Sequence, residues 1–285
     1  MSSARSVFQR AALRALAVVP LLAVTVPASA QLVRSAVGPT AADITAARDQ
    51  FRLDLGGGAA AGANGSFGGV RREINWDGVP DALSAPNLLP ANFFNVNSPR
   101  GVVFATPGTG FQVSANAGAA PIEFDNIDPS YSATFGVFSP QRLFTALGSN
   151  IVDVNFFLAG TTTAALTRGF GAVFTDVDLA NSTSLTFFDV NGASLGTFFA
   201  PGLVGSQTFS FLGVSFADAI VSRVRITSGN AALAAGVRDG GSTDLVVMDD
   251  FIYGETVAVV PEPATLLLTG GGLALLALAS RRRAR

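Results

Sequence analysis

The chain has 285 residues, a formal net charge of −2 at pH 7, and no cysteine, histidine or lysine. These absences exclude a Ser-His-Asp triad, a cysteine nucleophile, an ordinary zinc site, a lysine Schiff base and a P-loop lysine. Carboxylates, hydroxyls and aromatic rings supply the chemistry that remains.

The first 30 residues have the pattern of a secretory signal peptide. A basic segment from Arg5 to Arg14 precedes an apolar run over residues 15–26 and the small-residue cleavage site Ala28-Ser29-Ala30. A buried N-terminal helix is the alternative, and the arginines argue against it. Cleavage makes Gln31 the mature N-terminus and predicts an exported body.

One amphipathic helix is predicted after the signal. Apolar residues recur three or four positions apart, at Ile44, Ala47, Phe51 and Leu55. Thr40 precedes them as a helix-start signal. The Gly- and Ala-rich stretch 56–69 is predicted to be a flexible linker, because it lacks the GK[ST] sequence of a phosphate-binding loop.

From Arg71 onward the pattern is that of short strands separated by Gly, Pro, Asn and Asp. The candidate strands are RGVVFAT, GFQVSA, IEFDNI, IVDVNFFL, GFGAVFTDVD, Leu185–Val190, Ser194–Phe199, TFSFLGVSF, RVRIT and Leu245–Gly254. In RVRIT, alternation turns Val224 and Ile226 inward and Arg223 and Arg225 toward water. Asn191-Gly192 predicts a type I′ hairpin turn.

The strand count and the 23 phenylalanines predict an all-β fold, a two-layer antiparallel sandwich that is jelly-roll-like, rather than a barrel. Pairs such as Phe187-Phe188 and Phe198-Phe199 place one ring on each face of a strand. The body loosely resembles the lectin-like and carbohydrate-binding-module sandwiches of exported bacterial proteins, a likeness of fold that assigns no activity.

Residues 264–279 form an uncharged segment that predicts a short C-terminal transmembrane helix. The sequence Pro261-Glu262-Pro263 lies before it, and Arg281, Arg282 and Arg283 follow it as a membrane stop. This three-part tail resembles the PEP-CTERM sorting signal, which is also described as an ice-binding-protein C-terminal domain. A permanent single-span anchor is the alternative.

The resemblance implies recognition by exosortase, a membrane protease and transpeptidase of Gram-negative bacteria that make extracellular polysaccharide. The chain would be held in the inner membrane, cleaved near the Pro-Glu-Pro motif, and released to the cell surface or extracellular matrix. The expected organisation is a signal peptide (1–30), an N-terminal helix and linker (31–70), a β-sandwich domain (71–256) and the sorting signal (257–285).

Four aspartates are candidate ligands for a structural Ca²⁺ ion, a cation that prefers carboxylate oxygens. Asp176 and Asp178 share one strand face, and Asp249 and Asp250 belong to another strand. If the two strands are neighbours, these side chains converge. Acids at strand ends that only face solvent or cap turns are the alternative. No other cofactor is expected.

Trp76, the only tryptophan, has Asn75 and Asp77 beside it and is a candidate for stacking on a sugar ring, with a core position as the alternative. Glycoside hydrolysis needs only two carboxylates, for which Glu73 and Glu123 are candidates. Neither lies in a hydrolase motif, so no enzyme activity is predicted.

The processed body retains eleven arginines and nineteen acidic residues, a net charge of −8 that disfavours nucleic acid as a partner. The expected function is that of a non-catalytic surface or matrix protein associated with polysaccharide. A carbohydrate-binding module is the alternative, and a two-carboxylate glycosidase is the third hypothesis. Expected partners are exosortase, the inner membrane and polysaccharide.

Overall fold

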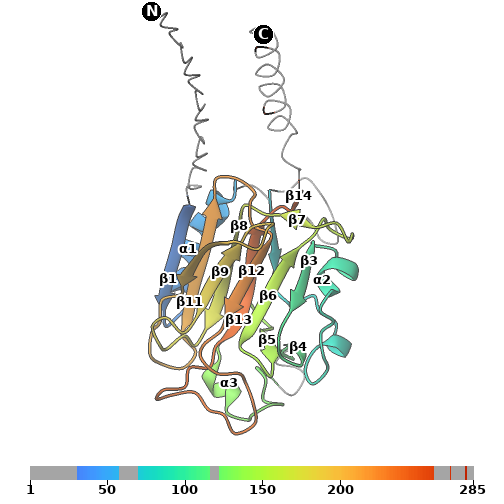
Figure 1. Cartoon of the computed structure of the whole chain (residues 1–285). Helices are drawn as coiled ribbons and strands as arrows, with labels where there is room; N and C mark the ends of the chain where they lie inside the picture. Colours follow the sequence, from blue (N-terminus) through green and yellow to red (C-terminus); the bar gives the residue numbers. More distant parts are fainter. Residues whose placement is uncertain (1–30, 58–69, 116–121, 260–269, 271–279, 281–285) are drawn as a thin grey trace, which may run out of the picture.

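Alternating apolar residues build two antiparallel sheets that pack face to face (Figure 1). The computed structural model describes residues 31–57, 70–115 and 122–259, together with Gly270 and Ser280. The sandwich expected from the sequence is confirmed.

The seven-stranded sheet has the order β1-β11-β8-β13-β5-β4, with β2 also paired to β13. Its strands are β1 (Gln31–Gly38), β2 (Arg71–Ile74), β4 (Gly110–Val113), β5 (Phe144–Leu147), β8 (Gly169–Thr175), β11 (Phe209–Phe216) and β13 (Val247–Gly254). The five-stranded sheet, of order β10-β9-β12-β6-β3, contains β3 (Val102–Ala105), β6 (Ile151–Phe156), β9 (Ser184–Phe188), β10 (Ser194–Phe199) and β12 (Arg223–Thr227).

The remaining elements lie outside the two main sheets. They are the pair β7 (Ala165–Leu166) and β14 (Val257–Ala258), the helices α1 (Ala41–Asp54), α2 (Phe93–Val96) and α3 (Tyr131–Thr134), and the 3-10 turn η1 (Asp81–Leu83).

The main core lies between the two sheets, where aromatic and branched side chains from both inner faces are buried. Phe104 of β3 packs against Phe144 of β5 in the other sheet, with 5.1 Å between ring centroids. Phe187 of β9 packs against Phe216 of β11 at 5.5 Å. Such ring contacts between layers fix the spacing and the relative position of the sheets.

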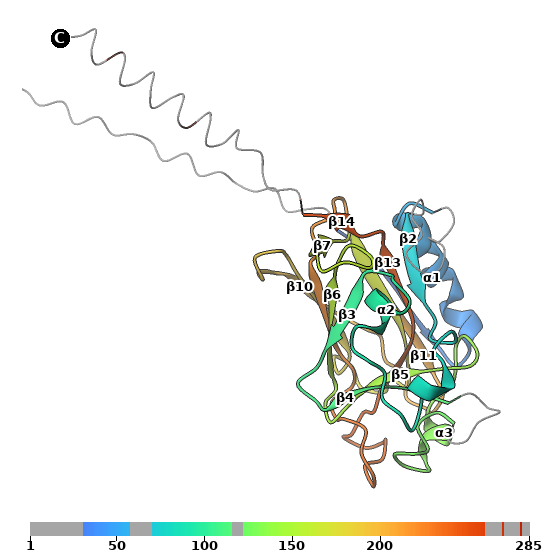
Figure 2. The ribbon, with the colours of Figure 1, turned by 90° about the vertical axis from the view of Figure 1, so that its right-hand side faces the viewer.

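Helix α1 covers the outer face of the seven-stranded sheet, as Figure 2 shows from the side. Thr40 and Asp43 form a capping box at its start, and Phe51 is fully buried against the sheet. The helix predicted from the apolar spacing is confirmed. Strands β8, β11 and β13 are buried along their full length, because the second sheet covers one face and α1 with adjoining loops covers the other.

The structure differs from the sequence prediction at several places. Strand β1 was not expected, and its pairing with β11 makes residues 31–57 part of the sandwich rather than a separate N-terminal segment. The segment IEFDNI forms turns, because Glu123 and Phe124 adopt positive φ angles of 39° and 70°. Since β1 carries mixed burial at the sheet edge, it lacks the regular alternation of an inner strand.

The β9–β10 hairpin is confirmed, but its turn is not of type I′. Only Gly192 has a positive φ, and the Gly192 N–H donates to the Asp189 carbonyl. The Asp189 carboxylate accepts the N–H groups of Asn191 and Ala193, which favours a type I turn followed by a left-handed glycine.

Several predictions fall outside the residues that the structure describes. They are the signal peptide (1–30), most of the linker (58–69), the Pro261-Glu262-Pro263 motif, the apolar segment except Gly270, and Arg281, Arg282 and Arg283. Within the described parts, no helix combines the length and apolar character needed to cross a membrane.

Candidate functional site

Trp76 lies in the core and does not face a ligand. Its side chain is 1% exposed, and its ring stacks on Phe144 with 4.1 Å between centroids and 2° between planes. Its Nε1 donates a hydrogen bond of 2.8 Å to the Asp249 carbonyl. The predicted ligand contact is therefore wrong, because the ring is enclosed among the phenylalanines between the sheets.

The first pair of candidate calcium ligands, Asp249 and Asp250, lies around Ser139. The Ser139 hydroxyl is 3.0 Å from Asp249 Oδ1 and 2.7 Å from Asp250 Oδ1, and the Phe138 N–H donates to Asp249 Oδ2 at 2.7 Å. Burial, followed by the charge of Asp250, raises the pKa of Asp249 well above its usual value. Burial also raises the pKa of Asp250, so the two groups favour sharing a proton.

The second pair, Asp176 and Asp178, has Asp239 and Asp244 as its acidic neighbours. Asp244 accepts the Asp178 N–H at 3.0 Å, and Asp178 in turn accepts the Gly205 N–H at 2.9 Å. Among the described residues, no group of three or more His, Cys, Asp or Glu side chains is placed to hold a metal ion. The expected four-aspartate calcium site is not assembled, because the two pairs have different partners.

Asp176 is itself unusual. It is fully buried with a φ of 70°, and within the described chain neither carboxylate oxygen has a hydrogen-bond partner. The nearby Gln207 N–H acts to lower the pKa of Asp176, but it donates its hydrogen bond to the Thr134 carbonyl at 2.7 Å. Burial, followed by the charges of neighbouring aspartates, raises the pKa of Asp176 to about 8.

The two glutamates considered for hydrolysis have opposite electrostatics. Burial alone would raise the pKa of Glu73, but its hydrogen bonds to Arg52 (2.9 and 2.6 Å) and Arg71 (2.8 Å) outweigh burial and lower it. Burial and the charge of Asp125 raise the pKa of Glu123. Glu73 therefore lacks the property that a proton donor needs.

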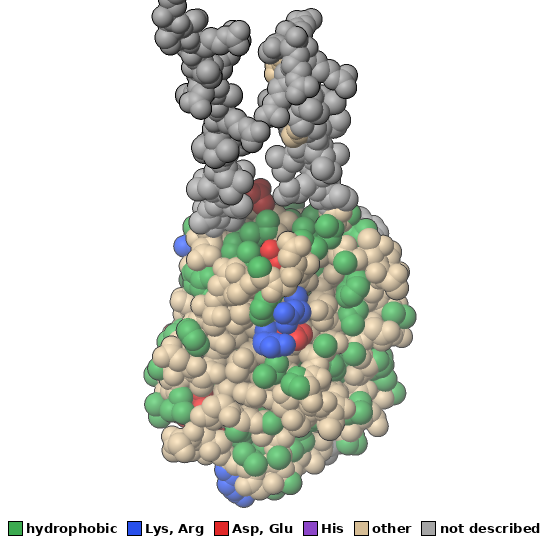
Figure 3. Space-filling model, viewed as in Figure 1, with side chains coloured by type: hydrophobic (Ala, Val, Ile, Leu, Met, Phe, Trp, Pro, Cys, Tyr) green, Lys and Arg blue, Asp and Glu red, His purple; other side chains and the backbone are tan. Residues whose placement is uncertain are grey.

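The outer face of the five-stranded sheet is the uncovered face of the sandwich (Figures 2 and 3). Strand register places its outward side chains in rows across the strands. One row is Phe188, Arg223, Asn155 and Val103, and the next is Thr197, Thr186, Arg225, Asp153 and Ala105. This "open face" is defined by these nine residues.

Two arginines and one aspartate lie side by side on neighbouring strands of the open face. Figure 3 shows blue side chains with red beside them on this side of the molecule. Arg225 binds Asp153 through two parallel bonds, Nε to Oδ1 at 2.9 Å and Nη2 to Oδ2 at 2.8 Å. Arg223 binds the same carboxylate through Nη1 at 2.9 Å. Burial would raise the pKa of Asp153, but the arginines outweigh burial and lower it.

Phe188 supports the Arg223 side chain. The guanidinium carbon of Arg223 lies 3.8 Å from the centroid of the Phe188 ring, a close cation–π contact. The hydroxyls of Thr186 and Thr197, in the adjacent row, are 2.9 Å apart. The open face thus combines an aromatic ring, charged hydrogen-bonding groups and hydroxyls on one rigid sheet.

A pocket of about 280 Å³ borders this face at the end near β7. Its lining includes Asn155 and Arg223 from the sheet, Ser222 just before β12, Asp189 from the β9–β10 turn and Phe157 from the β6–β7 connection. The hairpin turn and the β6–β7 connection therefore form walls beside the arginine row.

No protein-family model matches this sequence, and no curated protein matches it either. The candidate site therefore rests on the geometry of the chain itself.

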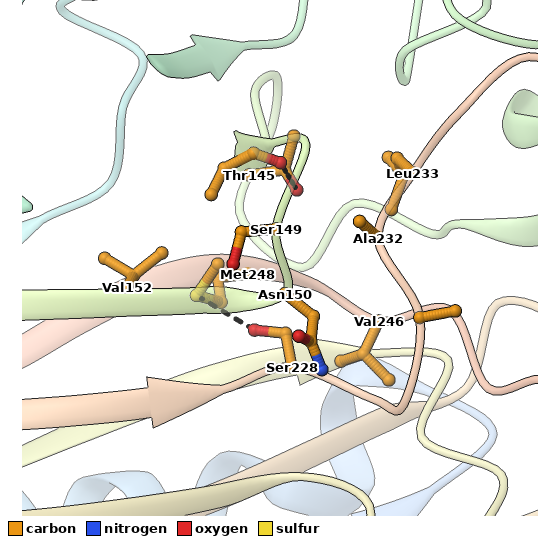
Figure 4. A pocket seen from close by; sticks show the side chains of 11 residues that line it. Thr145, Ser149, Asn150, Val152, Ser228, Ala232, Leu233, Val246 and Met248 are labelled. Atoms are coloured by element: carbon orange, nitrogen blue, oxygen red, sulfur yellow. Dashed lines mark hydrogen bonds between the residues drawn. The ribbon is translucent and has the colours of Figure 1, made fainter. Parts of the chain in front are cut away.

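A second pocket lies at the other end of β6, where Figure 4 shows Ser149, Asn150 and Ser228 beside Met248. The Ser228 hydroxyl lies 3.6 Å from the Met248 sulfur. The pocket has no room for even a water-sized molecule, so it offers no ligand site.

Part of the open face was predictable from the sequence. Alternation in RVRIT placed Arg223 and Arg225 outward, and the Phe187-Phe188 pair placed one ring outward. The role of Asp153 and Asn155 was missed, although they alternate with buried valines in β6. Nothing in the sequence identifies β6 and β9 as the two neighbours of β12.

Proposed function

We propose that this chain is an exported, non-catalytic protein associated with polysaccharide, and that it binds polysaccharide across the open face. The proposal rests above all on the cluster of Phe188, Arg223, Arg225 and Asp153, which presents hydrogen-bonding groups on a sheet that no other described element covers.

Sugar rings offer hydroxyl groups that both donate and accept hydrogen bonds, and weakly polar faces that pack on aromatic rings. The open face supplies arginine donors, the Asp153 carboxylate and the hydroxyls of Thr186 and Thr197 within two adjacent rows. The strand backbone holds them in fixed positions, which reduces the entropy lost on binding. We further propose that the sandwich is jelly-roll-like and similar in fold to carbohydrate-binding sandwiches.

Export and sorting are the second part of the proposal. The signal-peptide pattern and the PEP-CTERM-like tail support secretion through the inner membrane and cleavage by exosortase. Intact-mass measurement of the native protein tests it: we expect a mature form that begins at Gln31 and ends near the Pro-Glu-Pro motif. Detection of Arg285 in the exported form would contradict the processing step.

Polysaccharide binding is tested with the purified full chain on immobilised neutral and acidic polysaccharides. Thr186→Trp, in the middle of the open face, is expected to abolish binding because its large ring covers the neighbouring row. Ala42→Trp, exposed on the helix that covers the opposite sheet, is the matched control and should retain binding. Equal binding by both variants would exclude the open face, and no binding by the unmodified chain would exclude the function.

A further inference from the structure

Arg223 and Arg225 are neighbours on one strand face but differ in how their guanidinium groups are used. Arg225 presents Nε and Nη2 to both oxygens of Asp153, the paired geometry that suits a carboxylate. Arg223 uses only Nη1 for Asp153. Within the described chain, the Nε and Nη2 atoms of Arg223 donate no hydrogen bond.

We propose that this free edge of Arg223 binds the carboxylate of an acidic sugar, so that the polysaccharide partner is a uronate-containing glycan. The inference rests on the proposed function, since it names the class of polysaccharide that the open face takes.

The surroundings of Arg223 favour this ligand. The Phe188 ring, 3.8 Å from the guanidinium carbon, and the Nη1 bond to Asp153 hold the group in one orientation before any ligand arrives. Only 26% of the Arg223 side chain is exposed, so the guanidinium is partly shielded from water. A bidentate carboxylate contact is stronger in such a setting than at a fully exposed arginine.

The adjacent pocket has space and hydroxyl-binding groups for the sugar ring. Its volume of about 280 Å³ is close to the lower limit of roughly 300 Å³ for ordinary ligand sites. Asn155 donates its amide N–H to the Val103 carbonyl at 3.2 Å, which leaves its amide oxygen to accept from a sugar hydroxyl. A carboxylate on Arg223 and a hydroxyl on Asn155 would orient one acidic sugar residue.

Asp189 is the acidic residue in the lining of this pocket, and its negative charge would repel a uronate. Its Oδ1 already accepts the N–H groups of Asn191 and Ala193, at 2.9 and 2.8 Å. Attraction of a uronate therefore depends on short-range pairing with Arg223 rather than on net charge. Since the Debye length is about 8 Å at physiological salt, more distant acids of the body are screened.

The experiment measures binding of the full chain to oligogalacturonate, to its fully methyl-esterified form and to a neutral glucan of equal length. We expect the free acid to bind at least 10-fold more tightly than the ester. Arg223→Gln should weaken free-acid binding about 10- to 100-fold, the range of a lost charge-assisted bond. Its effect on the ester should be small.

Arg223→Lys keeps the charge but lacks the paired N–H geometry, and we expect it to restore only part of the affinity. Arg238→Gln is the charge-matched control, because Arg238 is exposed on the β12–β13 connection, which Figure 1 shows at the opposite end from β7. It should leave binding unchanged.

Four outcomes would overturn the inference. Equal binding of acid and ester, or full affinity in Arg223→Gln, would exclude the carboxylate contact while the proposed polysaccharide function stands. Binding of the neutral glucan alone would do the same. Failure of the unmodified chain to bind any of the three would remove both proposals.

Discussion

Asp153 joins Arg223 and Arg225 on the outer face of β6 and β12, because a single carboxylate accepts hydrogen bonds from both guanidinium groups. Arg225 donates to both carboxylate oxygens of Asp153, whereas Arg223 donates only to Oδ1, which also accepts from Arg225. The Nε and Nη2 atoms of Arg223 therefore remain available, and the proposed binding of a sugar carboxylate rests on this difference.

Replacing Asp153 by Asn is expected to change stability only modestly, by about 1 kcal/mol or less, because the ion pairs are partly exposed. The pKa of Asp153 is lowered in the folded protein, so its contribution is present above the unfolded value of about 3.9 and is lost as the pH falls below it. Thermal melts of both proteins at pH 7 and pH 3 measure this. A larger stability difference at pH 3 than at pH 7 would contradict the prediction.

The contact between Phe188 and Arg223 predicts a loss of affinity on Phe188→Ala. A cation–π contact at a partly exposed site contributes about 1 kcal/mol, so glycan binding should fall about fivefold. Isothermal titration calorimetry measures the change. Phe199→Ala is the control, since Phe199 is 47% exposed at the end of β10 and has no arginine contact among the described residues. An equal loss in both variants would show that the arginine contact is not the cause.

Asp176→Asn is expected to stabilise the protein at alkaline pH. The pKa of about 8 in the folded state exceeds the unfolded value, so the unfolded chain binds fewer protons between about pH 4 and pH 8. The stability of the unmodified protein therefore falls as the pH rises through this window. The asparagine variant removes the charge and tolerates the positive φ.

We expect a gain on the order of 2 kcal/mol at pH 8, because the asparagine avoids a buried, unpaired negative charge, and a much smaller gain at pH 4, where Asp176 is protonated. Urea unfolding at both pH values measures it. Asp218→Asn, an exposed acid on the β11–β12 connection, is the control and should show no such pH dependence. A gain that is equal at pH 4 and pH 8 would contradict the assignment to Asp176.

The close packing of α1 on β11 predicts that Gly213→Ala destabilises the protein. A Cβ atom on Gly213 would lie 2.7 Å from Cγ of Phe51, and Phe51 is fully buried under the helix. The overlap should cost about 1–3 kcal/mol. Chemical denaturation measures the loss, and the double variant with Phe51→Leu should recover part of it. Additive losses in the double variant would show that the two residues do not conflict.

Local periodicity was sufficient for much of the secondary structure. The spacing of Ile44 and Phe51 predicted α1, and the alternation in RVRIT predicted both β12 and the side on which Arg223 and Arg225 lie. Turns were less predictable: the Asp189 carboxylate, rather than Asn191-Gly192 alone, decides the turn type through hydrogen bonds to the backbone.

The sequence by itself determined the class of fold, because this depends on composition and on patterns within short segments. On the same basis it predicts the export and sorting signals of the two ends. Only the tertiary structure decided that Trp76 is core, that the two aspartate pairs have separate neighbours, and that Asp153 meets two arginines. Each of these depends on which strands pair and in what register, and pairing joins residues that are distant along the chain.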